Sequence, residues 1–289
     1  MRVTILNAAF AVLVAGAASL ATAQDCWEPN RCECGWYAGV EYLLLKPDTH
    51  RQGFDGFFYE GAPGAALAEG SYSNELQGGL RFEAGHVDCC GRGARGRYFA
   101  YDNTLDYTGE WDGGVPVALL GPVTVDIDVV DLELTKSVRR GDWELQGAAG
   151  ARYGKLQITD PSGMFAGLAA AVFGGATGVD YEGVGPTVAL ELGRRLGDSG
   201  TKLVGRGRMG LLFGDAVVDS AFLAGGRARF DDEFTQVWEF QLGVETKRAL
   251  AGHRVDLGAY WETQYWDSES GVLDDFRLHG VALKAGLSY

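Results

Sequence analysis

The sequence predicts an all-β protein: a transmembrane, antiparallel, up-and-down β-barrel of about ten strands. Three observations predict it: a secretory leader, long segments in which apolar and polar residues alternate, and connections that alternate in length. Eight or twelve strands are the alternatives, because one hairpin more or less would change the count by two.

The first 23 residues have the pattern of a signal peptide. A basic start precedes an apolar run, Val3–Leu20, and an A-x-A cleavage motif ends at Ala23. A membrane anchor is the alternative, but the run is rich in alanine and ends in a cleavage site. Lipidation at Cys26 is rejected because Asp25 precedes it. We therefore expect secretion across the inner membrane.

The mature chain divides into a cysteine-containing periplasmic segment, residues 24–35, and the barrel, residues 36–289. The sequence has 44 glycines, 7 Trp, 12 Tyr and 14 Phe but only 7 prolines, which suits neither a disordered chain nor a helical domain. Its net charge of −14 disfavours nucleic-acid binding, since phosphate neutralisation needs a basic face. No cofactor is expected.

Five cysteines lie on the side of the barrel that we expect to face the periplasm. They are Cys26, Cys32, Cys34, Cys89 and Cys90. A secreted chain favours disulfides, and the spacing matches no zinc module. Adjacent cysteines rarely bridge each other, and neighbouring strands are about 5 Å apart. We predict that Cys89 and Cys90 pair with two of the other three, and that no metal is bound.

Alternation with a period of two is the most informative pattern. In Thr201–Gly214, Leu203 and Leu211 share one parity, whereas Arg206 and Arg208 share the other. This arrangement gives a strand one apolar face and one wet face. A soluble sandwich also alternates, but these segments are about a dozen residues long, enough to cross the hydrocarbon of a membrane.

Ten segments follow this pattern. They are Trp36–Lys46, Asn74–Val87, Gly96–Thr108, Val123–Val138, Trp143–Ile158, Tyr181–Leu196, Thr201–Gly214, Asp232–Thr246, His253–Trp266 and Arg277–Tyr289. Connections after odd segments have 27, 14, 22, 17 and 10 residues, and those after even segments have 8, 4, 4 and 6. Long extracellular loops and short periplasmic turns are typical of outer-membrane barrels, and both termini are then periplasmic. A phase shift over Ile127–Leu132 is interpreted as a bulge.

Aromatic residues at the segment ends predict interfacial girdles. They are Trp36, Tyr37, Trp143 and Tyr289 on the periplasmic side, and Tyr107, Phe213, Phe234, Tyr265 and Trp266 at the opposite rim. Leu283, Leu287 and the terminal Tyr289 also look like the signal that the β-barrel assembly machinery reads. This machinery, outer-membrane lipid and lipopolysaccharide are the expected partners.

Several short motifs, in order along the chain, resemble the Legionella-type major outer membrane protein family. They lie in Gly35–Pro47, Asp128–Glu133, Gly150–Tyr153, Tyr181–Pro186, Glu191–Arg195, Gln241–Gly243 and Gln264–Trp266. The resemblance spans most of the mature chain and implies a pore-forming barrel without catalytic residues.

The polar parity of the segments predicts which side chains line the lumen. They are Arg81, Arg152, Glu191, Arg195, Lys202, Arg206, Arg208, Glu239, Glu245 and Glu262. Basic residues gather on the sixth and seventh segments and acidic residues on the eighth and ninth, while inward glycines leave room. This pattern has two interpretations. The opposed charges produce a transverse electric field across a water-filled lumen, or they form salt bridges that close the barrel.

The favoured function is a narrow pore for ions or small polar solutes in the cell outer membrane. A structural or adhesive surface barrel without transport is the alternative, and a surface hydrolase is less favoured. Among the histidines, only His279 lies near acidic residues in sequence, Asp274 and Asp275. The chain has no G-x-S-x-G motif, so we expect that it is not an enzyme.

Overall fold

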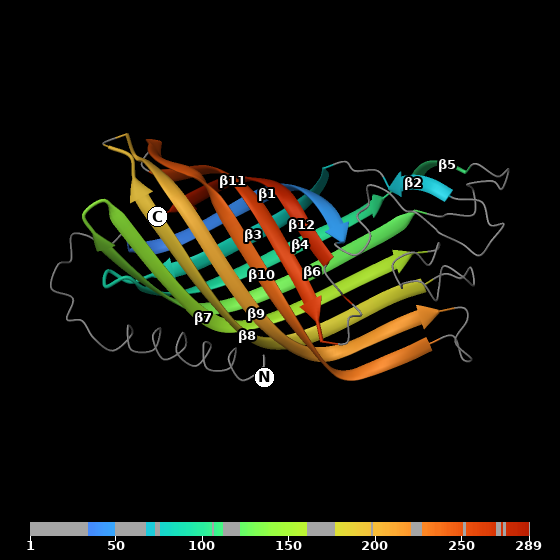
Figure 1. Ribbon diagram of the computed structural model, residues 1–289. Coiled ribbons are helices and arrows are strands. Elements are labelled where there is room, and N and C mark those ends of the chain that lie inside the picture. Colours follow the sequence, from blue (N-terminus) through green and yellow to red (C-terminus); the bar gives the residue numbers. More distant parts are fainter. Residues whose placement is uncertain are drawn as a thin grey trace.

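The computed structural model describes residues 34–49, 68–72, 76–105, 107–111, 122–160, 177–197, 199–220, 227–250, 253–269, 273 and 276–288. Ten strands in this part of the chain form one closed antiparallel barrel (Figure 1). They are β1 (Gly35–Thr49), β3 (Gln77–Val87), β4 (Arg92–Leu105), β6 (Val123–Arg140), β7 (Trp143–Asp160), β8 (Thr177–Arg195), β9 (Thr201–Ser220), β10 (Arg227–Leu250), β11 (His253–Ser268) and β12 (Phe276–Ser288). Among the described residues, no helix is long and apolar enough to cross a membrane.

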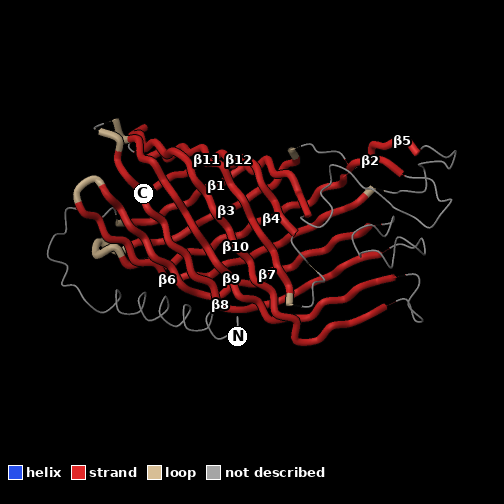
Figure 2. Tube along the Cα trace, in the orientation of Figure 1, coloured by secondary structure: helices blue, strands red, loops and turns tan. Residues whose placement is uncertain are grey.

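The barrel strands follow one another around the barrel in chain order, and β12 closes it against β1. Connections at one end span residues 88–91, 141–142, 196–200 and 251–252, whereas those at the other span 50–76, 106–122, 161–176, 221–226 and 269–275. Figure 2 shows short turns at the left end, where β12 also finishes. The predicted antiparallel barrel of ten strands is confirmed, and β1 begins and β12 ends at the end of the barrel that carries the short connections.

Two further strands pair outside the barrel. β2 (Ala68–Tyr72) and β5 (Tyr107–Trp111) lie in the first two long connections and form an antiparallel pair beyond the extracellular end (Figure 1). The predicted third segment, Gly96–Thr108, is therefore displaced: β4 starts at Arg92 and ends at Leu105, and Tyr107 belongs to β5. The small sheet links the two connections.

Strand β6 shows how the polarity of the sheet changes along the barrel. In its extracellular half the inward Val125 and Ile127 are buried, while Asp128 faces outward. In its periplasmic half Asp131 is buried inside and Leu132 faces outward. Pairing with β4 and β7 continues through this region without a shift, so the predicted bulge is wrong. The exposed apolar side chains of β6 thus lie on the outer face of its periplasmic half, where hydrocarbon would be expected to cover them.

Strands β9 and β10 extend further outward than predicted. The prediction ended one strand at Gly214 and resumed at Asp232, but the hairpin is paired up to Asp219 and Arg227. Its register shifts between Phe230 and Glu233, where Asp232 has a φ of 59°. Aspartate tolerates this left-handed region better than most residues, and such bulges add twist. The bulge therefore lies between the outer part of this hairpin, residues 215–230, and the part that is in the barrel's regular register.

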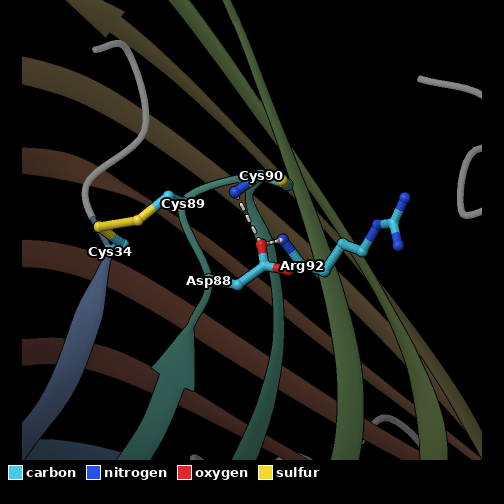
Figure 3. The surroundings of a disulfide bond; sticks show 5 residues. All are labelled: Cys34, Asp88, Cys89, Cys90 and Arg92. Atoms are coloured by element: carbon cyan, nitrogen blue, oxygen red, sulfur yellow. Dashed lines mark hydrogen bonds between the residues drawn. A yellow bond between two sulfur atoms is a disulfide. The ribbon is translucent and has the colours of Figure 1, made fainter. Parts of the chain in front are cut away.

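A disulfide joins the start of β1 to the first periplasmic turn. Cys34 and Cys89 are bonded, with 4.6 Å between their Cα atoms, and Cys90 is disulfide-bonded as well. The Asp88 carboxylate accepts hydrogen bonds from the backbone N–H groups of Cys90 and Arg92, both at 2.8 Å (Figure 3). The turn is therefore fixed both covalently and by its own aspartate.

Non-reducing peptide mapping should recover Cys34 linked to Cys89. We expect the same digest to contain Cys90 linked to Cys26 or Cys32, two cysteines that lie outside the described residues, because Cys90 is bonded and Cys34 is already used. A digest in which all five cysteines carry the alkylating label without prior reduction would contradict this pairing.

Candidate functional site: the barrel lumen

The extracellular half of the lumen is filled by apolar side chains. All are buried and all come from inward positions of the barrel strands or, for Leu273, from the connection before β12. They include Leu43, Leu45, Phe99, Tyr101, Val123, Val125, Ile127, Leu156, Ile158, Val179, Tyr181, Leu212, Ala216, Val237, Trp266, Leu273, Phe276 and Leu278. We call this group the apolar plug. A layer of this kind excludes water from the mouth of the barrel.

Trp266 is the largest side chain of the apolar plug. It is 0% exposed, and its ring crosses the lumen from β11 to β7: a Cβ added at Gly154 would lie 3.3 Å from it. Leu212 of β9 meets the same point, at 2.9 Å. The prediction that Trp266 belongs to an interfacial girdle is therefore wrong, because its parity on β11 is that of the buried Glu262 and Gln264.

Below the apolar plug lies a layer of charged side chains, the ionic layer. The described strands contribute eight acidic and eight basic members, so their formal charges cancel. They are Glu41, Glu83, Asp131, Glu133, Glu191, Glu239, Glu245 and Glu262, and Arg81, Arg95, Arg97, Arg152, Lys202, Arg206, Arg208 and Lys284.

Two fully buried arginines hold the centre of the ionic layer. Arg152 donates to both oxygens of Asp131 at 2.6 and 3.0 Å, and to Glu239 at 2.5 Å. Arg81 donates to Glu41 at 2.6 Å and to Glu262 at 2.5 and 3.0 Å. The planar guanidinium suits such forked contacts, which bring carboxylates of different strands together.

Arg206 and Arg208 of β9 complete the ionic layer. Arg206 donates to Glu191 at 2.8 Å and to Glu41 at 3.3 Å, and it also contacts Glu245. Arg208 contacts Glu133 and donates to Asp131 at 3.2 Å. Both guanidiniums are thus paired directly with carboxylates rather than facing them across water.

The charges interleave around the barrel instead of forming two opposed walls. Basic members come from β3, β4, β7, β9 and β12, and each of these strands neighbours a strand with acidic members. The segregation expected from the sequence is wrong because strands outside β8–β11 also contribute charged members, among them Arg81 of β3 and Asp131 of β6. Alternating charges cancel over short distances, so the layer has no strong transverse field.

Large side chains from the same strand or from other strands cover the inward glycines. A Cβ at Gly210 would lie 2.9 Å from Cδ of Arg152, and one at Gly258 would lie 2.5 Å from the Tyr260 hydroxyl. Tyr37 occupies the space over Gly85 in the same way. The room that these glycines were expected to leave is therefore filled.

A cavity of about 580 Å³ opens beneath the ionic layer at the periplasmic end. Glu144, Lys247, Arg254 and Asp256 are among its lining residues, together with the lower members of the ionic layer such as Lys202. A smaller space of about 30 Å³ has several charged residues of the ionic layer in its lining, among them Glu41, Arg97 and Glu239. It has room for about one water molecule.

Comparison with known proteins supports the same architecture. No family model and no curated protein matches the sequence. The crystal structure of the outer-membrane protease OmpT from Escherichia coli is similar, with 11% identity, a TM-score of 0.50, and coverage of 91% of this chain and 99% of that one. This chain has the fold of an outer-membrane β-barrel.

Two more solved outer-membrane barrels match less closely. The β domain of the Bordetella autotransporter BrkA has 15% identity and a TM-score of 0.44, and the match covers 89% of this chain and 100% of that domain. Neisserial surface protein A has 11% identity and a TM-score of 0.36, covering 88% and 97%. No family model supports the Legionella-type resemblance.

Nine of the ten residues predicted to line the lumen of this outer-membrane barrel lie in the ionic layer. The tenth, Arg195, has the inward parity of Glu191 but is exposed at the periplasmic end of β8. Seven members of the layer were not predicted. They are Glu41, Glu83, Arg95, Arg97, Asp131, Glu133 and Lys284, and each is a charge on the inward parity of its strand.

The histidine considered for catalysis does not face the lumen. His279 alternates with the buried Leu278 and Gly280, so it lies on the outer face of β12. Asp274, Asp275 and His50 are outside the described residues. In the part of the chain that the structure describes, no group of three or more His, Cys, Asp and Glu side chains is arranged to hold a metal ion.

Proposed function

We propose that this outer-membrane barrel is sealed and serves as a structural or adhesive surface protein rather than as a channel. The observation that carries the proposal is the apolar plug, whose side chains span the lumen between β7 and β11 at Trp266. The neutral ionic layer below it supports the same conclusion, because its charges are already neutralised by direct contact. Enzymatic activity is not part of this proposal.

Residence in the outer membrane and assembly there belong to the proposal. Leu283 and Leu287 face outward on β12 and are exposed, as contacts with lipid and with an assembly factor require. Tyr289 and the signal peptide lie outside the described residues. The proposed partners are outer-membrane lipid, lipopolysaccharide and the β-barrel assembly machinery.

A narrow pore for ions or small polar solutes is the second candidate. The periplasmic cavity of about 580 Å³ favours it, because this space brings solvent up to Lys202 and Arg206. The resemblance to the Legionella-type family supports it as well. A pore would require the apolar plug to move.

Planar-bilayer recordings separate the two candidates. We expect no discrete conductance steps from wild-type protein that is folded by heat-modifiable gel migration, since the lumen is packed. Replacing Arg206 and Arg208 by Glu should reduce the folded fraction rather than shift a reversal potential, because it adds unpaired buried charge. A known porin, reconstituted in parallel, is the positive control. Discrete steps from folded wild-type protein would overturn the sealed barrel and establish the pore.

A further inference from the structure

Four arginines lie at the periplasmic end of the barrel, one on each of four strands. Arg92 begins β4, Arg140 ends β6, Arg194 lies next to the last residue of β8, and Arg248 lies near the end of β10. All four are exposed. We call them the arginine collar.

The collar points toward the membrane rather than into the lumen. Arg140 has the parity of the exposed Leu134 on β6, and Arg194 has that of Leu192 on β8. The guanidiniums therefore sit at the lower border of the apolar outer face. Beside them, Trp143 is 47% exposed, with the guanidinium carbon of Arg194 5.2 Å from its ring centroid. An exposed Trp at the border of an apolar outer face is typical of a membrane interface.

In the described part of the chain, the collar arginines have no carboxylate partner. Within the described strands and turns, none of the four forms an ion pair, whereas the exposed arginines at the opposite end do. There Arg227 lies 3.2 Å from Asp219, and Arg229 lies 2.7 Å from Asp215. Among the described residues, Arg227 and Arg229 are thus paired with carboxylates, whereas the collar arginines are not.

The same outward positions carry the opposite charge at the extracellular end. Above the apolar middle of the strands, β4 has Asp102, β6 has Asp126 and Asp128, and β8 has Asp180 and Glu182. Each of these strands thus runs from acidic residues through apolar ones to an arginine on one face. On this face the positive charge of the three strands therefore lies at the periplasmic end.

We infer that the arginine collar binds the phosphate groups of anionic phospholipids in the periplasmic leaflet of the outer membrane. A guanidinium fits a phosphate in a two-pronged contact, and an arginine near an anionic lipid surface favours association by about fivefold. A soluble partner is disfavoured because the exposed Trp143 pairs in register with Arg140 on one side and with Arg194 on the other, at the border of the apolar outer face. The inference rests on the transmembrane fold and holds for a sealed or an open lumen.

Native mass spectrometry of protein released from bilayers tests it. The bilayers contain equal amounts of phosphatidylglycerol and phosphatidylcholine. We expect wild-type protein to retain phosphatidylglycerol over phosphatidylcholine by about fivefold or more. The variant R92Q/R140Q/R194Q/R248Q should retain both lipids equally. The matched control, R227Q/R229Q, removes arginines from the extracellular end and should keep the wild-type preference.

Three results would overturn the inference: equal retention by the wild type, an unchanged preference in the collar variant, or loss of bound lipid when millimolar inorganic phosphate is added. The last would assign the site to free phosphate. If the collar variant does not fold, the wild-type protein alone tests the inference. Raising the salt concentration before release must weaken its preference for phosphatidylglycerol, because salt screens exposed charges. A salt-independent preference would contradict the collar as its source.

Discussion

Replacing Arg152 by Met is expected to lower the free energy of unfolding by about 3–5 kcal/mol, one of the largest single-residue effects in this barrel. Arg152 is 0% exposed and is the shared partner of Asp131 and Glu239, so the variant leaves two buried carboxylates without their main cation. Urea unfolding in detergent micelles, followed by tryptophan fluorescence, measures the change.

Two further variants show whether the loss comes from unpaired charge. Arg229→Met removes an exposed arginine that contacts Asp215, and we expect an unchanged unfolding midpoint because water screens this pair. The triple variant R152M/D131N/E239Q removes the stranded charges as well and should recover part of the lost stability. Equal losses for Arg152→Met and Arg229→Met would show that the ionic layer is not desolvated.

Replacing Trp266 by Ala is expected to cost about 3–5 kcal/mol, through lost apolar burial and the cavity left between β11 and β7. Trp261 of the same strand is the matched control. It faces outward and is 54% exposed, so detergent or lipid can occupy the space when it is shortened. Its replacement by Ala should cost much less in the same urea titration. A Trp261→Ala loss as large as that of Trp266→Ala would contradict the apolar plug as a packed layer.

The strand count and the direction of each strand could be predicted because alternation and connection length are local. The short turns after β6, β8 and β10 stand out against the long outer connections. Prediction failed on β6, where Ile127 faces inward and Leu132 outward. The face of a strand that carries the apolar residues is the buried face only if the outside of the strand has the same surroundings along its whole length. On β6 the apolar residues change from the inward to the outward face, as expected where the surroundings change from water to hydrocarbon.

The state of the lumen could not be predicted because its contacts are remote in sequence. Arg97 donates to Glu239, 142 residues away, and Arg81 donates to Glu262, 181 residues away. Which side chains meet across a barrel depends on strand number and stagger, neither of which an individual strand encodes. The inward parity did identify most of the charged members, but their direct pairing follows from the closed geometry.

The exchange of polarity along β6 also means that the two halves of one continuous sheet face different surroundings and are stabilised by different interactions. Water surrounds the extracellular half, whose apolar interior is stabilised by the hydrophobic effect, a force that weakens on cooling. Acyl chains surround the other half, whose interior depends on paired charges, and the cost of desolvating charges falls as temperature rises. Both halves therefore lose cohesion toward low temperature, for unrelated reasons, and cold is the stress to which they respond together.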